Sequence, residues 1–386
     1  MKKILAITGI RSDYDLMSSL YRMLNKEPGV DFQLLVGGAH MSQTYGHSID
    51  LIRADGIKTL LCVESLIDSD SAAARLKTAS IMLQGVIDSV ANWRPDLIIY
   101  AGDREEVWIG ALLGAYLEVP TVHFYGGDHT ITGHVDNAVR HAVSKLSTAH
   151  FVATVEHKER LLAMGEDSKR IFVTGSLALD NFVEKEQLPI SILNMRLQVD
   201  LPDTGYAIAL FHPDPSEKSV AGQYMLNIIE ATINSGVFVC IGYPNSDPAS
   251  RDVINVIEKF RGHESVHVYK NLTRDDFIGL YKGALFIIGN SSSGIMEAAS
   301  IPIPVINVGL RQRGRRAGKN VIFSDGDISS IQSAIDNVQS KKFRDSLLEL
   351  VNPYGDGKST KRALKILLNE DFKLNRLKVE DPLVTK

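Results

Sequence analysis

The chain is poor in the residues that mark extracellular and metal-bound proteins. Its 386 residues include only two cysteines, Cys62 and Cys240, which lie in or near apolar segments and far apart in the sequence. We therefore expect two free thiols in a reducing compartment, not a disulfide. No Cys-x-x-Cys pair and no Cys/His spacing typical of zinc occurs. Accordingly, we expect no metal and no other cofactor.

Long apolar stretches are also absent. The N-terminal segment MKKILAITGI resembles the start of a signal peptide, but its apolar run is short and is followed at once by Arg11 and Asp13. No stretch approaches the ~18 consecutive apolar residues of a membrane span. The expectation is a cytoplasmic protein without a membrane segment.

Neither sign of charge dominates the chain. The 42 Lys and Arg residues and the 46 Asp and Glu residues give a formal net charge of −4 at pH 7. This balance does not favour nucleic acid or an anionic membrane surface as a partner, so a bound nucleotide must be held by local positive charge. The length of the chain favours two hydrophobic cores over one.

Short apolar runs alternate with longer amphipathic stretches. Apolar runs without polar alternation predict strands that are covered on both faces, and strand–helix repetition predicts parallel sheets with right-handed crossovers. The predicted strands cover residues 4–8, 32–36, 97–101, 121–124, 150–153, 206–211, 237–241, 266–269, 285–288 and 304–308. The main predicted helices cover residues 14–26, 105–117, 135–146 and 359–369.

The pattern pauses over residues 181–202, a stretch of mixed charge with Pro189 and Pro202, which we expect to be a linker. This divides the chain into two Rossmann-like α/β domains, residues 1–180 and residues 203–354. We expect residues 355–386 to form a helix and tail that pack back on the first domain. Because open parallel sheets bind ligands beyond the carboxyl ends of their strands, the informative residues are those that directly follow strands.

The segment IIGNSSSGIMEAAS carries the strongest signal for a ligand. A predicted strand ends there in small residues, and a helix begins around Ser291, Ser292, Ser293 and Gly294. Small residues let a phosphate approach the backbone, and serine hydroxyls and the amides of a first helical turn can bind it. Glu297, one turn later, can accept both hydroxyls of a ribose. The alternative is that the serines only cap a helix and that Glu297 is a surface charge.

The loop after the next predicted strand, LRQRGRRAGK over residues 310–319, is strongly basic within an acidic protein. A solvated run of charge is the usual explanation of such a loop. This loop follows the strand that comes directly after the serine segment, so it is expected at the same edge of the sheet. That position favours contact of its arginines with a nucleotide instead.

Polar residues also follow the predicted strands of the first half, in the segments GIRSDY, GDREE and GGDH. Arg11 and Arg104 are placed to hold a diphosphate. Asp103, Asp128 and Asp136 provide carboxylates that can move protons. Three carboxylates and two arginines at one edge of a sheet are hard to explain as helix caps alone.

Two further residues have competing explanations. Asp13 follows a strand and is expected to be a helix cap only. His212 ends a predicted strand in Phe-His-Pro, where a functional role is favoured over a structural one because Pro213 fixes the backbone behind it. The four histidines between residues 123 and 141 match no standard zinc spacing.

Seven segments together carry a family resemblance. They are GIRSDYD (residues 9–15), GDREE (102–106), GGD with GHVDNAVRHAVSKLS (126–147), FHP (211–213), YPNSD (243–247), GNSSSG with a glutamate (289–297) and GLRQRGR with AG and NV (309–321). In this order the chain resembles the hydrolysing UDP-N-acetylglucosamine 2-epimerases of sialic acid and legionaminic acid biosynthesis. The resemblance implies a GT-B fold, in which two Rossmann-like domains with parallel sheets face a central cleft. It also implies a homodimer or homotetramer.

The same resemblance implies roles for individual residues. Asp103 and Asp136 match acid/base carboxylates, and His212 matches a histidine near the phosphates and the glycosidic oxygen. The other matched residues are Arg11, Arg104, Ser291 and Ser292 for the phosphates, Glu297 for the ribose, Leu272 and Phe277 for the uracil, and Asn245 and Arg311 for further contacts in the cleft.

One position departs from the family pattern. Some members carry a glutamate with a catalytic role directly before the Gly-Gly pair, and this chain has Tyr125 there. Other related sequences also lack a carboxylate at this position, and Asp128, just after the pair, is available as a substitute. The departure leaves open the amino sugar and one proton-transfer group.

The chemistry predicts elimination, because no carbonyl acidifies the C2 proton of an acetamido sugar. A carboxylate takes this proton as the nucleotide leaves C1, and a glycal forms. Water then adds at C1 while a proton returns to the other face of C2. The products are the free 2-epimer, N-acetylmannosamine or a diacetamido relative, and UDP or GDP. The alternatives are a non-hydrolysing epimerase or another GT-B glycosyl enzyme, and a nucleotide-sugar-binding protein without catalysis.

Overall fold

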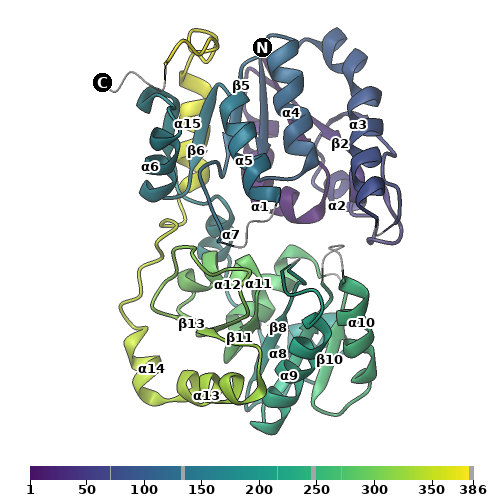
Figure 1. The fold of residues 1–386 in the computed structure, drawn as a ribbon, viewed down its shortest axis with the longest axis vertical. Coiled ribbons are helices and arrows are strands. Elements are labelled where there is room, and N and C mark those ends of the chain that lie inside the picture. The colour runs from purple at the N-terminus through teal and green to yellow at the C-terminus, as the bar shows by residue number, and fades with distance from the viewer. Residues whose placement is uncertain (70, 132–134, 215, 245–248, 271, 382–386) are drawn as a thin grey trace. The chain divides into compact units, whose positions relative to one another are not determined.

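A computed structural model describes residues 1–69, 71–131, 135–214, 216–244, 249–270 and 272–381. The chain forms two compact units, whose elements are labelled in Figure 1. Unit 1 comprises Met1–Asp128, His134–Asp180 and Gly357–Lys386. Unit 2 comprises His129–Gly133 and Asn181–Asp356.

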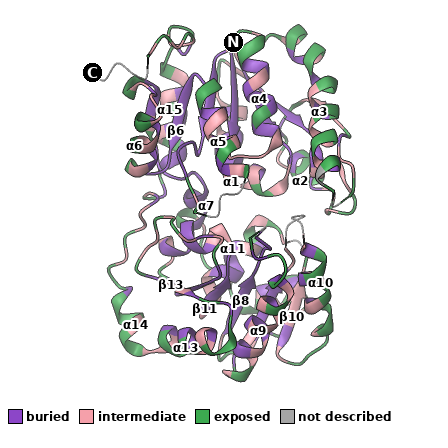
Figure 2. Cartoon of the chain, in the orientation of Figure 1, coloured by how far each residue is buried: buried purple, intermediate pink, exposed green. Residues whose placement is uncertain are grey.

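Unit 1 is built on a seven-stranded sheet in the order β3-β2-β1-β4-β5-β6-β7. Its strands are β1 (Lys2–Thr8), β2 (Val30–Val36), β3 (Thr59–Cys62), β4 (Leu97–Ala101), β5 (Thr121–Phe124), β6 (Ala149–Val152) and β7 (Ile171–Val173). All neighbouring pairs are parallel, so the carboxyl ends of the strands share one edge. The central strands β4, β5 and β6 are buried along their whole length (Figure 2). This agrees with strands that helices cover on both faces.

The helices of unit 1 are α1 (Arg11–Lys26), α2 (Ile49–Ala54), α3 (Ala72–Trp93), α4 (Glu105–Tyr116), α5 (Val135–Leu146), α6 (Val155–Ala163), the start of α7 (Ala178–Glu184) and α15 (Ser359–Asn369), with short 3-10 turns η1 (Gly38–Met41) and η2 (Ser168–Arg170). The C-terminal helix α15 packs against α1. Its first amides, those of Ser359 and Thr360, donate to the carboxylate of Asp180 at 3.0 and 2.7 Å. The buried carboxylate of Asp180 thus anchors the start of α15 to unit 1.

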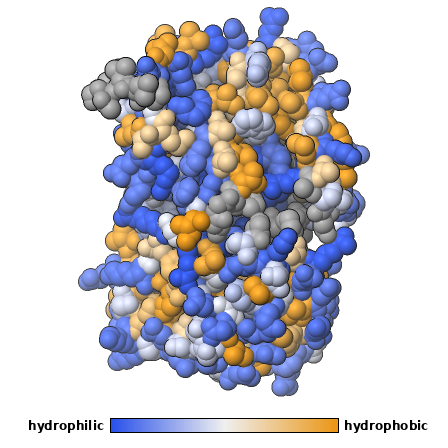
Figure 3. All heavy atoms as spheres, viewed as in Figure 1, coloured by the Kyte–Doolittle hydropathy of each residue, from blue (hydrophilic) through white to orange (hydrophobic). Residues whose placement is uncertain are grey.

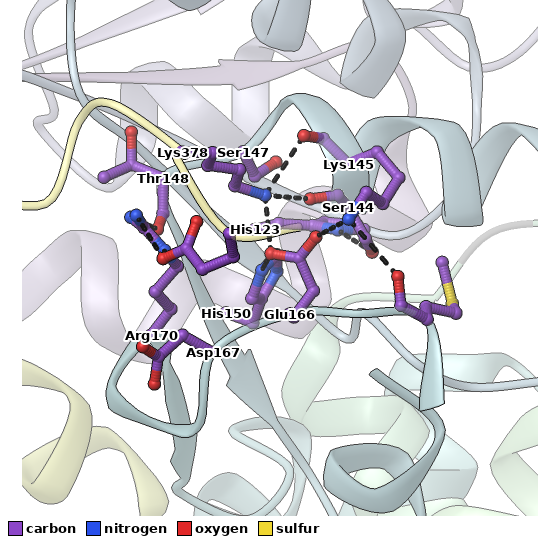
Figure 4. A network of polar contacts seen from close by, with 12 residues as sticks. His123, Ser144, Lys145, Ser147, Thr148, His150, Glu166, Asp167, Arg170 and Lys378 are labelled. Atoms are coloured by element: carbon purple, nitrogen blue, oxygen red, sulfur yellow. Dashed lines mark hydrogen bonds and ion pairs between the residues drawn. The ribbon is translucent and has the colours of Figure 1, made fainter. Parts of the chain in front are cut away.

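The tail after α15 is held by a buried polar network (Figure 4). Lys378 donates to the carbonyl oxygens of Ser144 and Lys145 at the end of α5, both at 3.0 Å, and to the carboxylate of Glu166. His150 lies 2.9 Å from the same carboxylate oxygen. Burial lowers the pKa of Lys378 to about 8, against the charge of Glu166. A half-buried cation therefore caps carbonyls in the last turn of α5, where the helix dipole favours positive charge.

Unit 2 is built on a six-stranded parallel sheet in the order β10-β9-β8-β11-β12-β13. Its strands are β8 (Tyr206–Leu210), β9 (Phe238–Gly242), β10 (Val266–Tyr269), β11 (Phe286–Gly289), β12 (Val305–Val308) and β13 (Val321–Ser324). Its helices are α8 (Ile190–Leu197), α9 (Ala221–Asn234), α10 (Ser250–Lys259), α11 (Arg274–Gly283), α12 (Ser292–Met296), α13 (Ile328–Gln339) and α14 (Lys341–Ser346), with the 3-10 turn η3 (Ala298–Ser300).

Residues 181–202 differ from the linker expected there. They belong to unit 2 and contain α8. Leu193 and Leu197 of α8, four residues apart, and Leu201 are buried in a core cluster with Tyr206 of β8. This helix is only eight residues long, so the sequence contains a single repeat of its apolar spacing. Prolines near both of its ends made the segment resemble a loop.

Both sheets share one strand order. Apart from the added β7, each unit follows the order 3-2-1-4-5-6 of the Rossmann fold. The order reverses between β1 and β4 in unit 1 and between β8 and β11 in unit 2. At such a switch point the loops after two adjacent strands diverge, and ligands bind in the crevice at the carboxyl ends. The prediction of two Rossmann-like α/β domains is confirmed.

Hydrophilic and hydrophobic residues are interspersed on the face shown in Figure 3. Within the part of the chain that the structure describes, no helix has both the length and the apolar character of a membrane span.

Candidate active site

The loop after β1 flanks the switch point of unit 1. Arg11 opens α1, and its Nε lies 3.5 Å from a carboxylate oxygen of Asp15. The carboxylate of Asp13 accepts from the backbone N–H groups of Gly9 at 3.0 Å and Ile10 at 3.4 Å. Asp13 therefore caps the start of α1, as predicted.

The loop after β4 lies on the other side of the switch point. Arg104 is the N-cap residue of α4, and its Nε lies 3.9 Å from Oε2 of Glu105. Glu106 is buried behind it, and a Cβ on Gly9 would overlap its carboxyl group. Burial raises the pKa of Glu106, although the charge of Arg104 opposes the shift. Gly9 thus gives the β1 loop room to pack on the start of α4.

Asp103, also in the β4 loop, forms an ion pair with Arg140 of α5, a residue only 4% exposed. Arg140 also donates to the side-chain oxygen of Asn137 at 3.1 Å and to the carbonyl oxygen of Asp128 at 3.0 Å. One buried guanidinium therefore ties the loops after β4 and β5 to α5. We assigned no role to Arg140 from the sequence, although its place one turn after Asp136 was an available signal.

Asp136 lies in the first turn of α5, on the same helix face as Arg140. Its Oδ1 is 3.3 Å from Nη2 of Arg75 on α3, and Arg75 also pairs with Glu105 at the start of α4. The structure thus places Asp103 and Asp136 at the same carboxyl edge of unit 1. Each carboxylate contacts an arginine, Asp103 that of α5 and Asp136 that of α3.

His123 fixes the loop that carries Asp103. This fully buried residue of β5 has Nε2 2.8 Å from the carbonyl oxygen of Gly102 and Nδ1 3.1 Å from the hydroxyl of Ser144. Burial lowers the pKa of His123 to about 3, so the ring is neutral and Nε2 carries the proton donated to Gly102. Among the described residues, no group of three or more His, Cys, Asp or Glu side chains is arranged to hold a metal ion.

The turn after β5 contains Tyr125, which stands where some family members have a catalytic glutamate. Tyr125 adopts a left-handed backbone conformation (φ 65°), which is strained for a residue with a bulky side chain. Its hydroxyl accepts from the backbone N–H of Leu177 at 3.2 Å, so its ring packs away as a structural group. A Cβ on Gly127 would overlap the carbonyl of His157, and Asp128 Oδ1 lies 3.5 Å from Nε2 of the same histidine.

In unit 2, Asn290 connects the three predicted segments at the switch point. Its side chain accepts from the backbone N–H of His212 at 2.7 Å and donates to the His212 carbonyl at 2.8 Å. Its own carbonyl accepts from Gln312 at 2.9 Å and Arg311 at 3.2 Å. Asn290 is 1% exposed. It therefore joins the Phe-His-Pro segment, the serine loop and the basic loop, a role that we did not infer from the sequence.

The serine loop begins at Gly289, whose φ of 132° and close approach to the Leu210 carbonyl exclude any side chain. Ser291 caps α12 through the N–H of Ser293, whose hydroxyl contacts Tyr281. Because α12 has only five residues, its dipole is small. An anion at this loop would therefore rely mainly on the backbone amides and the serine hydroxyls.

Glu297 ends α12 and is 5% exposed, so the alternative of a surface charge is wrong. Burial raises the pKa of Tyr281, and the negative charge of Glu297 raises this pKa further. Ser292 is half-buried beside it, and Gly294 is buried because its Cα packs close to Val305.

The residues matched to the uracil lie by α11 in unit 2. Leu272 and Phe277 are half-buried and pack on the core cluster around Tyr281, whose ring centroid is 4.7 Å from that of Phe277. Asn245 lies outside the described residues. The predicted residues thus form two groups, one at the carboxyl edge of each sheet.

Residues 22–368 match the profile of the UDP-N-acetylglucosamine 2-epimerase family. The chain belongs to this family. It is 32% identical over 367 residues to the UDP-N,N'-diacetylbacillosamine 2-epimerase (hydrolyzing) of Legionella pneumophila, which covers 95% of this chain and 96% of the relative. It is also 32% identical over 335 residues to the UDP-N-acetylglucosamine 2-epimerase of Neisseria meningitidis, with 87% of each chain covered.

Solved structures of the family have the same fold. The UDP-GlcNAc 2-epimerase of Neisseria meningitidis, in a crystal structure bound to UDP-GlcNAc, matches with a TM-score of 0.79 at 17% identity. The match covers 95% of this chain and 100% of that one. The GT-B fold class and the assignment to enzymes of the hydrolysing 2-epimerase type, both predicted from the sequence, are confirmed.

Proposed function

We propose that the protein converts a nucleotide-activated 2-acetamido sugar into its free 2-epimer and a nucleoside diphosphate. The substrate is UDP-N-acetylglucosamine or a UDP- or GDP-linked 2,4-diacetamido sugar, because the relatives are named for substrates of both kinds. The observation that carries the proposal is the pair of carboxylates, Asp103 and Asp136, at one sheet edge, each paired with an arginine.

Unit 1 is proposed to act on the sugar. Inversion requires that a proton leave one face of C2 and return to the other, so two groups are needed. Asp103 takes the C2 proton while the C1–oxygen bond to the nucleotide breaks, which yields UDP and a 2-acetamidoglycal. Asp136 then delivers a proton to the opposite face of C2 as water adds at C1. Arg140 and Arg75 hold these two carboxylates in place.

Unit 2 is proposed to bind the nucleotide. Ser291, Ser292 and the amides beside them are donors for the phosphates, and Arg311 supplies positive charge. His212, anchored by Asn290, is placed to stabilise charge on the leaving oxygen. The acceptor proposed for the ribose hydroxyls is Glu297. Further nucleotide contacts proposed from the resemblance involve Arg11, Arg104, Leu272, Phe277, Ser293, Gly294 and Asn245.

The biological setting follows from this chemistry. A free 2-epimer suits the synthesis of sialic-acid-like or legionaminic-acid-like sugars. We further propose a cytoplasmic location, since Cys62 and Cys240 are free thiols, as in a reducing compartment. A homo-oligomer is proposed from the family resemblance. Sedimentation equilibrium of the purified protein tests the oligomeric state.

Product analysis by NMR tests the function. The protein is incubated with UDP-N-acetylglucosamine, UDP-2,4-diacetamido and GDP-2,4-diacetamido sugars. Free 2-epimer plus nucleoside diphosphate from one of them supports the proposal. A nucleotide-linked 2-epimer would instead indicate a non-hydrolysing epimerase. Nucleotide release that requires an acceptor would indicate a glycosyltransferase, and binding without any product would leave a nucleotide-sugar-binding protein.

A further inference from the structure

The turn after β5 brings Asp128 against a histidine from α6. Nε2 of His157 lies 3.5 Å from Oδ1 of Asp128. This separation is longer than a formed hydrogen bond, and a small rotation of either side chain closes it. The side chain of Asp128 is 13% exposed and that of His157 is 6% exposed. Both side chains are therefore largely buried, and the carboxylate is slightly more exposed than the imidazole.

The backbone of His157 is held from two sides. Its N–H donates to the N-cap residue Thr154 at 3.2 Å, which fixes the first turn of α6. Its carbonyl packs so closely on Gly127 that a Cβ there would overlap it. Arg160, one turn later in α6, donates to the carbonyl oxygen of Gly127. The turn that carries Asp128 and the start of α6 thus form one rigid platform.

Asp128 is also tied to the carboxylates already described. Its carbonyl oxygen accepts from Arg140, the residue that pairs with Asp103. The groups that face the Asp128 turn from neighbouring elements are therefore His157 and Arg160 on α6 and Arg140 on α5. The hydroxyl of Tyr125 in the same turn lies by the start of α7, where it accepts from the backbone N–H of Leu177 at 3.2 Å and is 3.5 Å from the hydroxyl of Ser176.

The geometry points to His157 as a positioning residue that holds Asp128 as the base for the hydration step. This inference rests on the proposed function. Water adds through its oxygen to C1 of the glycal, its proton passes to Asp128, and the C1–C2 π pair takes a proton from Asp136 at C2. Asp103 and Asp128 finish protonated and Asp136 ionised. One proton returns to Asp136, and the other leaves with the products, as hydrolysis to UDP and sugar requires.

Four variants test the inference on the full-length protein: Asp128→Asn, His157→Ala, His157→Gln and the double variant Asp128→Asn/His157→Ala. His157→Ala impairs water addition after elimination and lowers kcat by about 10- to 100-fold, with KM within about threefold. The loss is smaller than the roughly 10²- to 10⁴-fold contribution of a general base, because Asp128 itself is still present. NMR then detects released 2-acetamidoglycal. His157→Gln, which keeps an N–H donor, restores most of the rate.

The double variant separates positioning from general stability. If His157 acts only through Asp128, its removal in the Asp128→Asn background costs no further rate. Losses that multiply in the double variant overturn the inference, as does a His157→Ala enzyme with normal kcat and no glycal. His263→Ala, at an exposed position before β10 in unit 2, is the histidine control and keeps full activity. A wild-type protein that forms no free 2-epimer refutes the proposed function instead.

Discussion

Replacement of Asn290 by alanine tests whether this residue holds the loops of His212 and Arg311 together in unit 2. The change leaves the backbone N–H and carbonyl of His212 without their partners at 2.7 and 2.8 Å. Both residues are buried, with 1% exposure for Asn290 and 8% for His212. A buried polar group that loses its partner costs about 1–3 kcal/mol, so two such groups set an upper range of about 2–6 kcal/mol. Because water can reach part of the new cavity, we expect a loss of about 3 kcal/mol.

Urea unfolding measures this loss as a shift of the midpoint, and calorimetric titration with UDP measures the effect on binding. Asn290→Ala should lower UDP affinity at least tenfold, because the loops of His212 and Arg311 lose their common anchor. Asn227→Ala is the matched control. Its side chain, at a half-buried site on α9, donates to the carbonyl of Gly326 at 2.8 Å and accepts from the exposed amide of Gln223 at 2.8 Å. It should cost less than about 1.5 kcal/mol and leave UDP binding unchanged.

The result that refutes this reasoning is an Asn290→Ala protein within about 1 kcal/mol of the wild type that binds UDP normally. Asn290 would then be replaceable by water, and the loops would be held by other contacts. Asn290→Asp adds a second arm to the experiment. It keeps the acceptor for the His212 N–H but turns an oxygen toward the His212 carbonyl, so it should be no more stable than the alanine variant.

Three further predictions concern unit 1. Asp103→Asn and Asp136→Asn should each lower turnover about 10²- to 10⁴-fold while UDP still binds, and near-normal rates in both would contradict their roles. Glu166→Gln should destabilise the protein at pH 7 by at most about 3 kcal/mol, since it removes the charge of a buried carboxylate that pairs with half-buried Lys378. Lys373→Met, at an exposed pair, should cost less than about 1 kcal/mol. Burial raises the pKa of Glu166, but the His150 hydrogen bond and the charge of Lys378 outweigh it and lower that pKa from 4.5 to about 2. Because the folded pKa lies below the unfolded one, the stability that Glu166 contributes is complete above about pH 4.5 and is lost as the pH falls through about 2. Acid unfolding followed by circular dichroism should show that loss in the wild type and not in Glu166→Gln.

The strands at the centre of each sheet were predictable because they are buried on both faces. Runs such as LIIYA of β4 and YAIAL of β8 are apolar at every position and fully buried. The three strands that we did not predict, β3, β7 and β13, have three or four residues each and are mostly half-buried. They lie at the outer edges of their sheets. An apolar run of only three or four residues does not by itself distinguish a strand from another buried segment.

The residues that hold the site were harder to infer than those proposed to act in it. Three residues that hold the site in place have an ordinary explanation in the sequence. They are Arg140, which reads as a charge on a helix, Asn290, which reads as a helix cap, and His123, which reads as a buried ring in a strand. Their roles depend on partners far away in the chain, as in the contact of Asn290 with His212 across 78 residues. No local spacing encodes such a contact.

The sequence alone determined which chemistry is present and where it falls along the chain. Apolar runs specify buried strands, and polar residues that directly follow them must reach the carboxyl edge of a parallel sheet. Only the tertiary structure decided which of these residues meet. The reversal of strand order sets the loops of β1 and β4, and of β8 and β11, beside each other. The packing of the helices then sets the ion pairs. Asp103 contacts Arg140 of α5, and Asp128 lies against His157 of α6. These contacts depend on strand order and on side-chain volumes in several elements, so no single segment of the sequence specifies them.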